Sequence, residues 1–585
     1  MQTAHTSNNL KRQLTRRFSI SAPALILLTV LWIALIANQS LWGQISDRLA
    51  PWSLSSIGYM LALLSLMVIL LATPLLIVAQ RWLLKPLLIS LLLFSATLAY
   101  FTQQLGVIFD IEMVRNVVET IVDQNTQEGA ELISWSMISF VALSTAFPLF
   151  VIARSNIKKS TLLQDQLSRV GWWCAMACIT AGLVAVNFKY VTYFSRENHD
   201  LEVYLTPFYT VKTARQLFQE KRKASNAVFT EIGRDAIQTK KHKRRTVGVM
   251  VVGETARSDH FSLNGYARDT SAELAKRHVI NFNNASSCGT STAYSVPCMF
   301  SFLGQENYSP EKAKQESNVL DVLQHAGVKT VWVDSNSSCK GVCARVESIN
   351  IMKDSLKILK QADSDSHLFV DGAWHDEKLL QYVDTYLDNS DEEVLLVLHT
   401  MGSHGPAYYR RYPNEKAQFA PFCQSKAPQD CSRELIVNAY DNTIAYTDHV
   451  LAKIIDKLAA RDDDSFMLYA SDHGESLGEN GVYLHGLPRF IAPASQTSVP
   501  VIAWFSDGYI NSKALPAQPL QVRQIDQAIT HDNLSASLLG LFDVKTDLYQ
   551  SELDLFKQGG HVFSDTAVAD NKNANGNALH QSVNK

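Results

Sequence analysis

Polar clusters follow four short apolar runs in the second half of the chain. The clusters are Gly253-Glu254-Thr255 after 246–252, Asp334 after 330–333, His399 and His404 after 394–398, and Asp472-His473-Gly474 after 466–470. Runs of this kind are typical of buried strands in a mostly parallel sheet, whose carboxyl ends share one edge. We therefore expect these side chains to meet, although His399 taken alone is more typical of a core histidine.

Three of these residues have the chemistry of metal ligands. Glu254, Asp472 and His473 offer carboxylate and imidazole groups without thiolate, a set that suits Zn²⁺ or Mn²⁺. Three protein ligands would leave a fourth tetrahedral position for a nucleophile or a substrate. The sequence therefore predicts a catalytic metal site.

The segment 287–293, SCGTSTA, is dense in hydroxyl groups. A bound cation lowers the pKa of coordinated water from about 15.7 to about 7, and it would activate a hydroxyl in the same way. Small residues also let backbone N–H groups approach a phosphate. Taken alone, such a segment is more often an ordinary turn.

The elements that must position these residues form an α/β domain. A fifth apolar run, 499–505, joins the four above, and helix-like stretches separate the runs. We place this catalytic domain at 246–558. The segment 559–585 is poor in apolar residues, and we expect a disordered tail there.

The first 190 residues contain five long apolar runs. They are 18–37, 57–79, 87–109, 132–153 and 170–188. About 20 apolar residues cross a bilayer as a helix, so residues 1–190 are predicted to form a five-span membrane domain. Basic residues flank the cytoplasmic side in this arrangement, for example Arg16, Arg17 and Lys158. The amino terminus is then cytoplasmic, and an odd number of spans exports everything after about residue 190.

Residues 191–245 connect the two parts. Aromatic residues interleave with charges, and a basic run closes the segment. We interpret it as an amphipathic linker that lies on the bilayer. A solvated linker with some helix is the alternative.

Six cysteines fall in close pairs in the exported part: Cys288 with Cys298, Cys339 with Cys343, and Cys423 with Cys431. An oxidising compartment favours disulfides, and we expect nearest-neighbour pairing among the roughly 15 possible arrangements. Reduced or zinc-binding cysteines are the alternative, which the spacing favours less because it lacks paired CxxC motifs.

Composition excludes several classes of protein. The 585 residues carry a net charge of −3, which provides no basic surface for nucleic acid. Apolar residues make up 47% and charged residues 19%, which excludes general disorder.

Four motifs resemble the phosphoethanolamine transferases of Gram-negative inner membranes. They are GETAR at 253–257, SCGTSTA at 287–293, SHGP at 403–406 and SDHGESLGENG at 471–481. This family includes the lipid A-modifying enzymes of polymyxin and colistin resistance and belongs to the alkaline phosphatase/sulfatase superfamily. The resemblance extends over the whole chain and implies a five-span helical membrane domain followed by an α/β domain of the alkaline phosphatase/sulfatase type.

The resemblance also implies roles for individual residues. Glu254, Thr292, Asp472 and His473 correspond to the zinc site, with one zinc ion or two, and Thr292 rather than Thr290 corresponds to the nucleophile. His404 and His485 are implied to contact the substrate phosphate, a second zinc ion or a proton in transit. Ser337 and Lys340 correspond to residues near the phosphoethanolamine head group, and Asn116 and Thr120 to residues of the membrane domain that reach toward the active site. The family continues after the threonine to a glutamate; here Glu128 is the candidate, with Asp123 and Gln124 as competitors. The Cys339–Cys343 spacing is narrower than in these relatives.

The implied reaction transfers phosphoethanolamine from phosphatidylethanolamine to lipid A or nearby lipopolysaccharide sugars. It would proceed through a phosphorylated Thr292 and release diacylglycerol, in a monomer of the inner membrane among membrane lipids, with the catalytic domain in the periplasm. A phosphoglycerol transferase of the same superfamily is the alternative enzyme, and an inactive lipid-binding membrane protein is the alternative outside catalysis. A sulfatase is disfavoured because no C/S-x-P-x-R motif is present.

Overall fold

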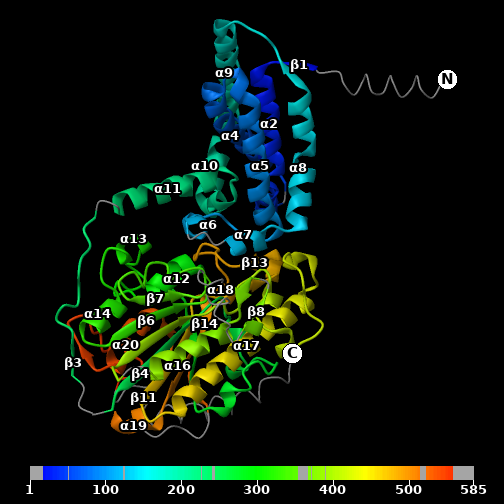
Figure 1. Ribbon diagram of the computed structural model, residues 1–585. Coiled ribbons are helices and arrows are strands. Elements are labelled where there is room, and N and C mark those ends of the chain that lie inside the picture. The colour runs from blue at the N-terminus through cyan, green and yellow to red at the C-terminus, as the bar shows by residue number, and fades with distance from the viewer. Residues whose placement is uncertain are drawn as a thin grey trace, which may run out of the picture. The chain divides into compact units, whose positions relative to one another are not determined.

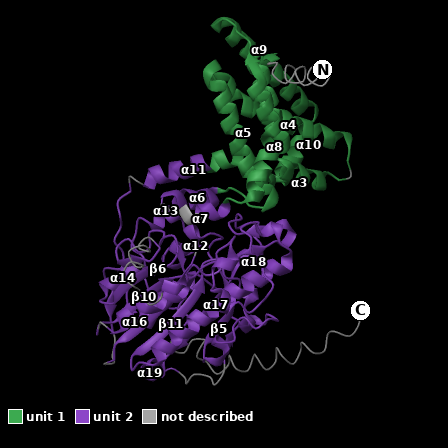
Figure 2. Ribbon diagram, turned by 45° about the vertical axis from the view of Figure 1, so that its right-hand side comes forward, with its two compact units in different colours: residues 1–110, 133–213 green, residues 111–132, 214–585 purple. Residues whose placement is uncertain are grey.

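The chain divides into two compact units. The computed structural model describes residues 18–50, 52–122, 126–224, 227–239, 244–352, 366–370, 372–388, 391–513, 515 and 522–557, with only the backbone described at 126–128. The first unit comprises the chain up to Asp110 and Ile133–Thr213, and the second comprises Ile111–Leu132 and the chain from Ala214 (Figure 2). The tail expected at 559–585 lies outside the described residues.

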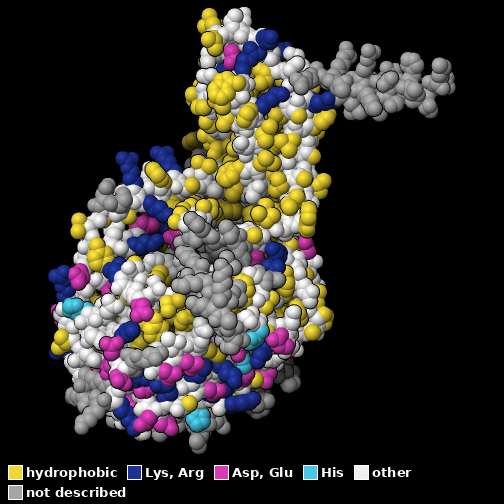
Figure 3. Space-filling view, in the orientation of Figure 1, with side chains coloured by type: hydrophobic (Ala, Val, Ile, Leu, Met, Phe, Trp, Pro, Cys, Tyr) yellow, Lys and Arg dark blue, Asp and Glu magenta, His cyan; other side chains and the backbone are white. Residues whose placement is uncertain are grey.

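The first unit is built from helices (Figure 1). They are α2 (Ala22–Ile36), α3 (Gln39–Leu49), α4 (Leu54–Val78), α5 (Arg81–Gln104), α8 (Trp135–Arg154), α9 (Leu162–Val186) and α10 (Phe188–Glu197). Four of them are long and apolar enough to cross a membrane, and the pair α2 and α3, bent by 58°, makes a fifth if it counts as one span. Apolar side chains cover much of the visible surface of this unit (Figure 3), as expected of a membrane domain.

A buried asparagine sets the bend between α2 and α3. The Asn38 amide donates to the carbonyl oxygens of Ile33 at 3.1 Å and Thr206 at 2.9 Å, and its oxygen accepts from the Thr206 N–H at 2.9 Å. These bonds join the end of α2 to the backbone of Thr206 at the point where the helix direction changes. The first predicted span, 18–37, therefore ends in a break, and a second short helix follows it.

The last long helix begins earlier than its apolar run. The predicted run starts at residue 170, but α9 begins at Leu162 because Thr161 and Gln164 form a capping box. Its Arg169 is buried and donates to the carbonyls of Leu76 at 2.8 Å and Ala79 at 2.7 Å, at the end of α4. The capping box and the hydrogen bonds of Arg169 therefore allow the helix to include the polar residues that precede its apolar run.

The second unit contains a nine-stranded sheet. Its main strands are β4 (Thr246–Gly253), β5 (Ile280–Ser286), β6 (Lys329–Asp334), β7 (Glu347–Asn350), β10 (Val394–His399), β11 (Asp464–Ser471), β14 (Ser498–Phe505) and β15 (Arg523–Ile525), in the order β15-β5-β14-β11-β4-β10-β6-β7, and β16 (Ile529–Thr530) pairs with β5. The four strands that precede the polar clusters are adjacent and parallel. Ser471 is in register with Gly253, and His399 with both Val252 and Asp334, so the clusters leave the sheet at one edge.

One expected strand runs in the other direction. The run 499–505 forms β14, which is antiparallel to both β11 and β5. A continuous apolar run indicates burial on both faces but not direction. The neighbouring strand β5 was not predicted, because the sequence INFNNAS is rich in asparagine and two of its central residues are exposed.

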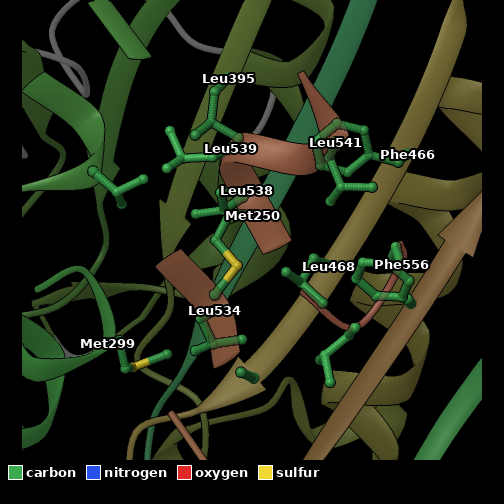
Figure 4. Close-up of a cluster of buried hydrophobic side chains, with 14 of the residues drawn as sticks. Met250, Met299, Leu395, Phe466, Leu468, Leu534, Leu538, Leu539, Leu541 and Phe556 are labelled. Atoms are coloured by element: carbon green, nitrogen blue, oxygen red, sulfur yellow. The ribbon is translucent and has the colours of Figure 1, made fainter. Parts of the chain in front are cut away.

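Helices cover both faces of the sheet. Figure 4 shows Leu534, Leu538 and Leu539 of α20 (Asp532–Leu541) packed with Met250 of β4 and Leu468 of β11 on one face. On the other face, α17 (Arg433–Ala459) packs against the alternate residues of β4. Each fully buried leucine contributes about 1.5–3 kcal/mol, so this core holds the strand ends in fixed positions.

Two short helices between the membrane helices belong to the second unit. They are α6 (Ile111–Val122) and α7 (Thr126–Leu132), which follow α5 and precede α8 in the chain. Helix α6 packs against α12 (Thr292–Met299). The loop after the third predicted span therefore contributes to the unit that contains the polar clusters.

The connector between the units is mostly helical. It contains α10, a 3₁₀ turn at His199–Tyr204, and α11 (Phe208–Ala224). Val211 and Phe218 of α11 are exposed, and Lys221, Arg222 and Lys223 occupy its last turn. This combination fits the predicted amphipathic segment, whose place on a bilayer stays a prediction.

Three disulfides connect the expected neighbours, Cys288 with Cys298, Cys339 with Cys343, and Cys423 with Cys431. The first joins the hydroxyl-rich loop to the far end of α12. Cys174 and Cys178 of α9 are free thiols.

Candidate metal centre and active site

Three residues predicted as metal ligands converge at the edge of the sheet. Ligand atoms of Glu254, Asp472 and His473 all lie within 4.8 Å of one another, and the three residues are buried. His473 Nε2 lies 3.3 Å from Asp472 Oδ2 and 3.5 Å from Glu254 Oε1. The structure therefore assembles the predicted carboxylate and imidazole donor set.

The imidazole of His473 is oriented to use Nε2 as a ligand. Its Nδ1 lies 2.9 Å from the carbonyl oxygen of Gly474, which can only accept, so Nδ1 carries the proton. Burial, together with the nearby His485, holds the pKa of His473 well below its usual value. The ring is therefore neutral and its Nε2 lone pair faces the carboxylates.

The two carboxylate oxygens of Asp472 differ in their hydrogen bonds. Oδ1 accepts from the backbone N–H groups of Thr255 at 3.1 Å and His473 at 2.7 Å, whereas the buried Oδ2 has no hydrogen-bond partner among the residues that the structure describes. Burial raises the pKa of Asp472 to about 6. A buried carboxylate oxygen without a partner is costly unless a cation compensates it, so the residues fit a divalent metal ion.

A hydroxyl of the SCGTSTA segment lies against these ligands. Thr292 Oγ1 is 3.1 Å from both carboxylate oxygens of Glu254 and 3.3 Å from His473 Nε2. Thr292 is the first residue of α12, where the helix dipole favours negative charge. Thr290 points elsewhere, because its hydroxyl donates to the Leu487 carbonyl at 2.7 Å.

Neighbouring residues fix the position of Glu254. The Asn336 amide donates to Glu254 Oε2 at 2.7 Å and to the Thr400 carbonyl at 3.1 Å. Gly402 has a φ of +49°, and a Cβ there would approach the Glu254 carbonyl oxygen to 2.7 Å. The close approach and the left-handed backbone both require glycine at this position.

A second histidine stands beside the ligands with its own carboxylate. The rings of His473 and His485 are 4.3 Å apart between centroids. His485 Nδ1 lies 2.8 Å from Glu475 Oε2, and the Tyr408 hydroxyl donates to Glu475 Oε1 at 2.6 Å. Glu475 is fully buried, so it can orient the imidazole and stabilise its protonated form.

Comparisons with known proteins show the family to which the chain belongs. Residues 246–544 match the sulfatase family model, and residues 63–222 match the model described as phosphoethanolamine transferase EptA/EptB. Phosphoethanolamine transferase EptA of Escherichia coli strain K12 is 34% identical over 552 residues, which cover 93% of this chain and 98% of that protein. This chain belongs to the phosphoethanolamine transferase family.

Other relatives of this transferase show the same extent of similarity. Phosphatidylethanolamine transferase Mcr-1 of Escherichia coli is 36% identical over 543 residues, which cover 91% of this chain and 96% of Mcr-1. The solved structure of the integral membrane protein lipooligosaccharide phosphoethanolamine transferase A from Neisseria meningitidis superposes with a TM-score of 0.83 at 30% identity, covering 92% and 98% of the two chains. The similarity therefore includes the membrane helices as well as the sulfatase-like domain.

Two residues that the sequence assigned to the head group are joined in this transferase. The Lys340 ammonium donates to the Ser337 hydroxyl at 2.7 Å, and both side chains are largely buried. The Ser337 N–H donates to Asn336 Oδ1 at 2.6 Å. Asn336 thus links the Ser337–Lys340 pair to Glu254, a connection that the sequence analysis did not identify.

The remaining sequence-predicted residues lie on two other segments. Asn116 and Thr120 are on α6, which packs against the helix of Thr292. The side chain of Glu128 in α7, and both of its competitors Asp123 and Gln124, lie outside the described residues. Their roles stay predictions.

His404 completes the group of histidines. Its ring centroid lies 5.7 Å from that of His485, and the His485 centroid lies 4.3 Å from that of His473. Two other residues from the strand-end clusters, His399 and Asp334, contact each other. His399 Nδ1 lies 3.2 Å from Asp334 Oδ1, and both side chains are buried. This pair belongs to the support of the sheet edge.

Protons should compete with metal for Asp472. A carboxyl with a pKa of about 6 in the metal-free protein is protonated below that pH and cannot ligate a cation. Because His473 stays neutral, we expect metal affinity to fall by about tenfold per pH unit below pH 6 and to level off above it. Calorimetric zinc titration of metal-free protein across this range measures the effect, and an affinity independent of pH would contradict it.

Proposed function

We propose that the protein transfers phosphoethanolamine from phosphatidylethanolamine to lipid A, or to nearby lipopolysaccharide sugars, through a phosphorylated Thr292. The observation that carries this proposal is the placement of Thr292 Oγ1 within 3.1–3.3 Å of Glu254 and His473. The names of relatives support the donor and acceptor, since they include a phosphatidylethanolamine transferase and a Kdo(2)-lipid A phosphoethanolamine 7''-transferase.

One zinc ion would be held by Glu254, Asp472 and His473 together with Thr292. Metal analysis of the purified protein distinguishes one bound ion from two. The donor set of two carboxylates and one neutral imidazole is typical of catalytic zinc. When bound, the ion supplies Lewis acidity and offsets negative charge beside the hydroxyl.

The proposed reaction has two chemical steps, and each uses particular residues of the chain. Thr292 Oγ1 bonds to the phosphorus of the donor while the bond to the diacylglycerol oxygen breaks, and the Thr292 proton is released to water. We assign the proton for the departing oxygen to His485, because Glu475 orients that ring. The acceptor then gives a proton to His485 and bonds to phosphorus while the bond from phosphorus to Thr292 Oγ1 breaks, and Thr292 takes up a proton from water. Ser337 and Lys340 would bind the phosphoryl or head group, and their link through Asn336 to Glu254 supports this role.

The chain's topology follows from the same proposal. Residues 1–190 would form an inner-membrane domain with a cytoplasmic amino terminus, residues 191–245 a linker, and 246–558 a periplasmic catalytic domain, except that α6 and α7 join the catalytic unit. Donor and acceptor are both lipids, so a tethered monomer would search in two dimensions.

Expression of the protein in a Gram-negative host tests this function. Mass spectrometry of lipid A should show an added phosphoethanolamine, and purified protein should release diacylglycerol from a fluorescent phosphatidylethanolamine. A phosphoglycerol transferase would instead leave phosphatidylethanolamine intact. Unmodified lipopolysaccharide in cells that contain folded protein would contradict the proposal.

The variant Glu475→Gln tests the assignment of His485. It removes the carboxylate that orients and stabilises the imidazolium, so we expect transfer to slow by about 10²-fold. With a phosphodiester whose leaving group is p-nitrophenol, the loss should be much smaller, because that oxygen departs without a proton.

The matched control is Tyr408→Phe, which removes only the second hydrogen bond to Glu475. We expect it to cost less than about tenfold. Equal losses of Glu475→Gln with natural and activated substrates would show that His485 does not carry the proton.

A further inference from the structure

A buried ion pair connects α7 to the loop that carries His404. Glu131, the penultimate residue of α7, pairs with Arg411, and their side chains are 2% and 5% exposed. The Arg411 Nε donates to the backbone carbonyl oxygen of His404 at 2.7 Å. One guanidinium therefore contacts α7 through Nη2 and the His404 backbone through Nε.

The other end of the same loop is fixed from within the sheet domain. Asp376 accepts from the backbone N–H groups of Met401 and Gly402, both at 2.8 Å. Gly402 in turn lies against the backbone of Glu254. The position of His404 is thus set by Asp376 at the start of the loop and by Arg411 at His404 itself.

The α6–α7 segment makes further close contacts around the site. Lys314 donates to Glu119 of α6 at 2.8 Å, and the buried Arg115 pairs with Glu311 at 3.0 Å. A Cβ at Gly486, the neighbour of His485, would collide with Met113 of α6. The segment is therefore packed on the loops of both site histidines.

We propose that Glu131 is a positioning residue for catalysis, which acts through Arg411 to hold His404 in the active site. A buried arginine without its carboxylate partner would lose its fixed orientation, and its bond to His404 would be lost with it. Glu131 lies in the chain between the helices α6 and α8, so an element encoded within the membrane half completes the catalytic centre. This inference rests on the proposed function and on the role that the family resemblance implies for His404, which is to contact the substrate or carry a proton.

The first experiment compares Glu131→Gln with Glu119→Gln in full-length protein, using release of diacylglycerol from fluorescent phosphatidylethanolamine. Both variants break an ion pair of the α6–α7 segment, but Glu119 pairs with Lys314, which is 42% exposed, and contacts no part of the His404 loop in the interactions that the structure gives. We expect Glu131→Gln to lower kcat by about ten- to a hundredfold, and Glu119→Gln by less than about twofold. Equal losses of activity in the two variants would overturn the proposal, because they would show that Glu131 only helps to hold the α6–α7 segment in place.

The second experiment separates positioning from stability, since Glu131→Gln leaves a buried charge. In the double variant Glu131→Gln with Arg411→Gln neither charge remains, and the thermal unfolding midpoint should recover. Activity should not recover, because the bond to the His404 carbonyl is still missing. Recovery of both would overturn the proposal.

The third measurement ties the effect to His404. In a His404→Ala background, Glu131→Gln should lower the rate of Thr292 labelling, followed over long incubations by intact mass, by less than about twofold further. Losses that multiply, or a His404→Ala variant with full activity, would overturn the inference. The proposed function fails separately, if Thr292→Ala retains transfer.

Discussion

Replacing Thr292 by alanine is expected to lower phosphoethanolamine transfer by more than about 10⁴-fold, because the bond to phosphorus would have no oxygen to form it. The hydroxyl is the one in contact with both Glu254 and His473. Thr292→Ala should retain its thermal stability, since it removes one small side chain at the start of α12, and the assay contains excess zinc because Thr292 is itself a proposed metal ligand. Diacylglycerol release and lipid A mass spectra measure the loss.

The matched control is Thr290→Ala, two residues earlier in the same loop. It removes the hydrogen bond to the Leu487 carbonyl, a structural contact worth about 1 kcal/mol. We expect it to keep most of the activity, and Thr292→Ser to keep more than Thr292→Ala. If Thr290→Ala were inactive and Thr292→Ala active, the nucleophile would be the other threonine.

The second large effect concerns the metal ligands. Asp472→Asn removes the negative charge of a buried carboxylate whose Oδ2 has no hydrogen-bond partner in the described part of the chain. We expect it to lower zinc affinity by more than about 100-fold, which exceeds the usual effect of residues that only support a metal ligand. Transfer should fall in parallel, and chelation of the wild-type protein should abolish transfer reversibly. Metal content by mass spectrometry and rates after zinc is restored provide the measurement.

Asn336→Ala provides the graded comparison. Asn336 only supports Glu254 through its bond at 2.7 Å, so its loss should weaken zinc binding by about 10–100-fold. Excess zinc should then restore activity to Asn336→Ala but not to Asp472→Asn. Full activity of the wild-type protein after stringent removal of metal would contradict the metal assignment.

The convergence of the proposed metal ligands could be predicted because a parallel sheet imposes a simple rule. Glu254 and Asp472-His473 each follow a run that reads as a buried strand, and parallel neighbours must end at the same edge. The direction of β14 could not be predicted in this way, because an apolar run indicates a buried strand but not whether the strand is parallel or antiparallel to its neighbours. Helix starts were also missed where a capping box, as at Thr161, extends a helix beyond its apolar residues.

The supporting residues could not be predicted from local pattern. Asn336 and Glu475 act through side-chain contacts with segments far apart in the sequence, and neither residue type is unusual in a loop. Glu131 gave still less indication, because it lies between two apolar spans and pairs with an arginine 280 residues away. The residues that follow strand ends are set by topology, whereas their partners are set by packing that only the folded chain reveals.

The central claim is that Thr292 becomes covalently phosphorylated beside the metal ligands. Purified full-length protein, incubated with phosphatidylethanolamine and no lipopolysaccharide, should gain the mass of one phosphoethanolamine group, and peptide fragmentation should locate it on Thr292. Addition of lipid A should then remove the group and transfer it to the lipid. Transfer to lipid A without any adduct on Thr292, or with an adduct on another residue, would contradict the account.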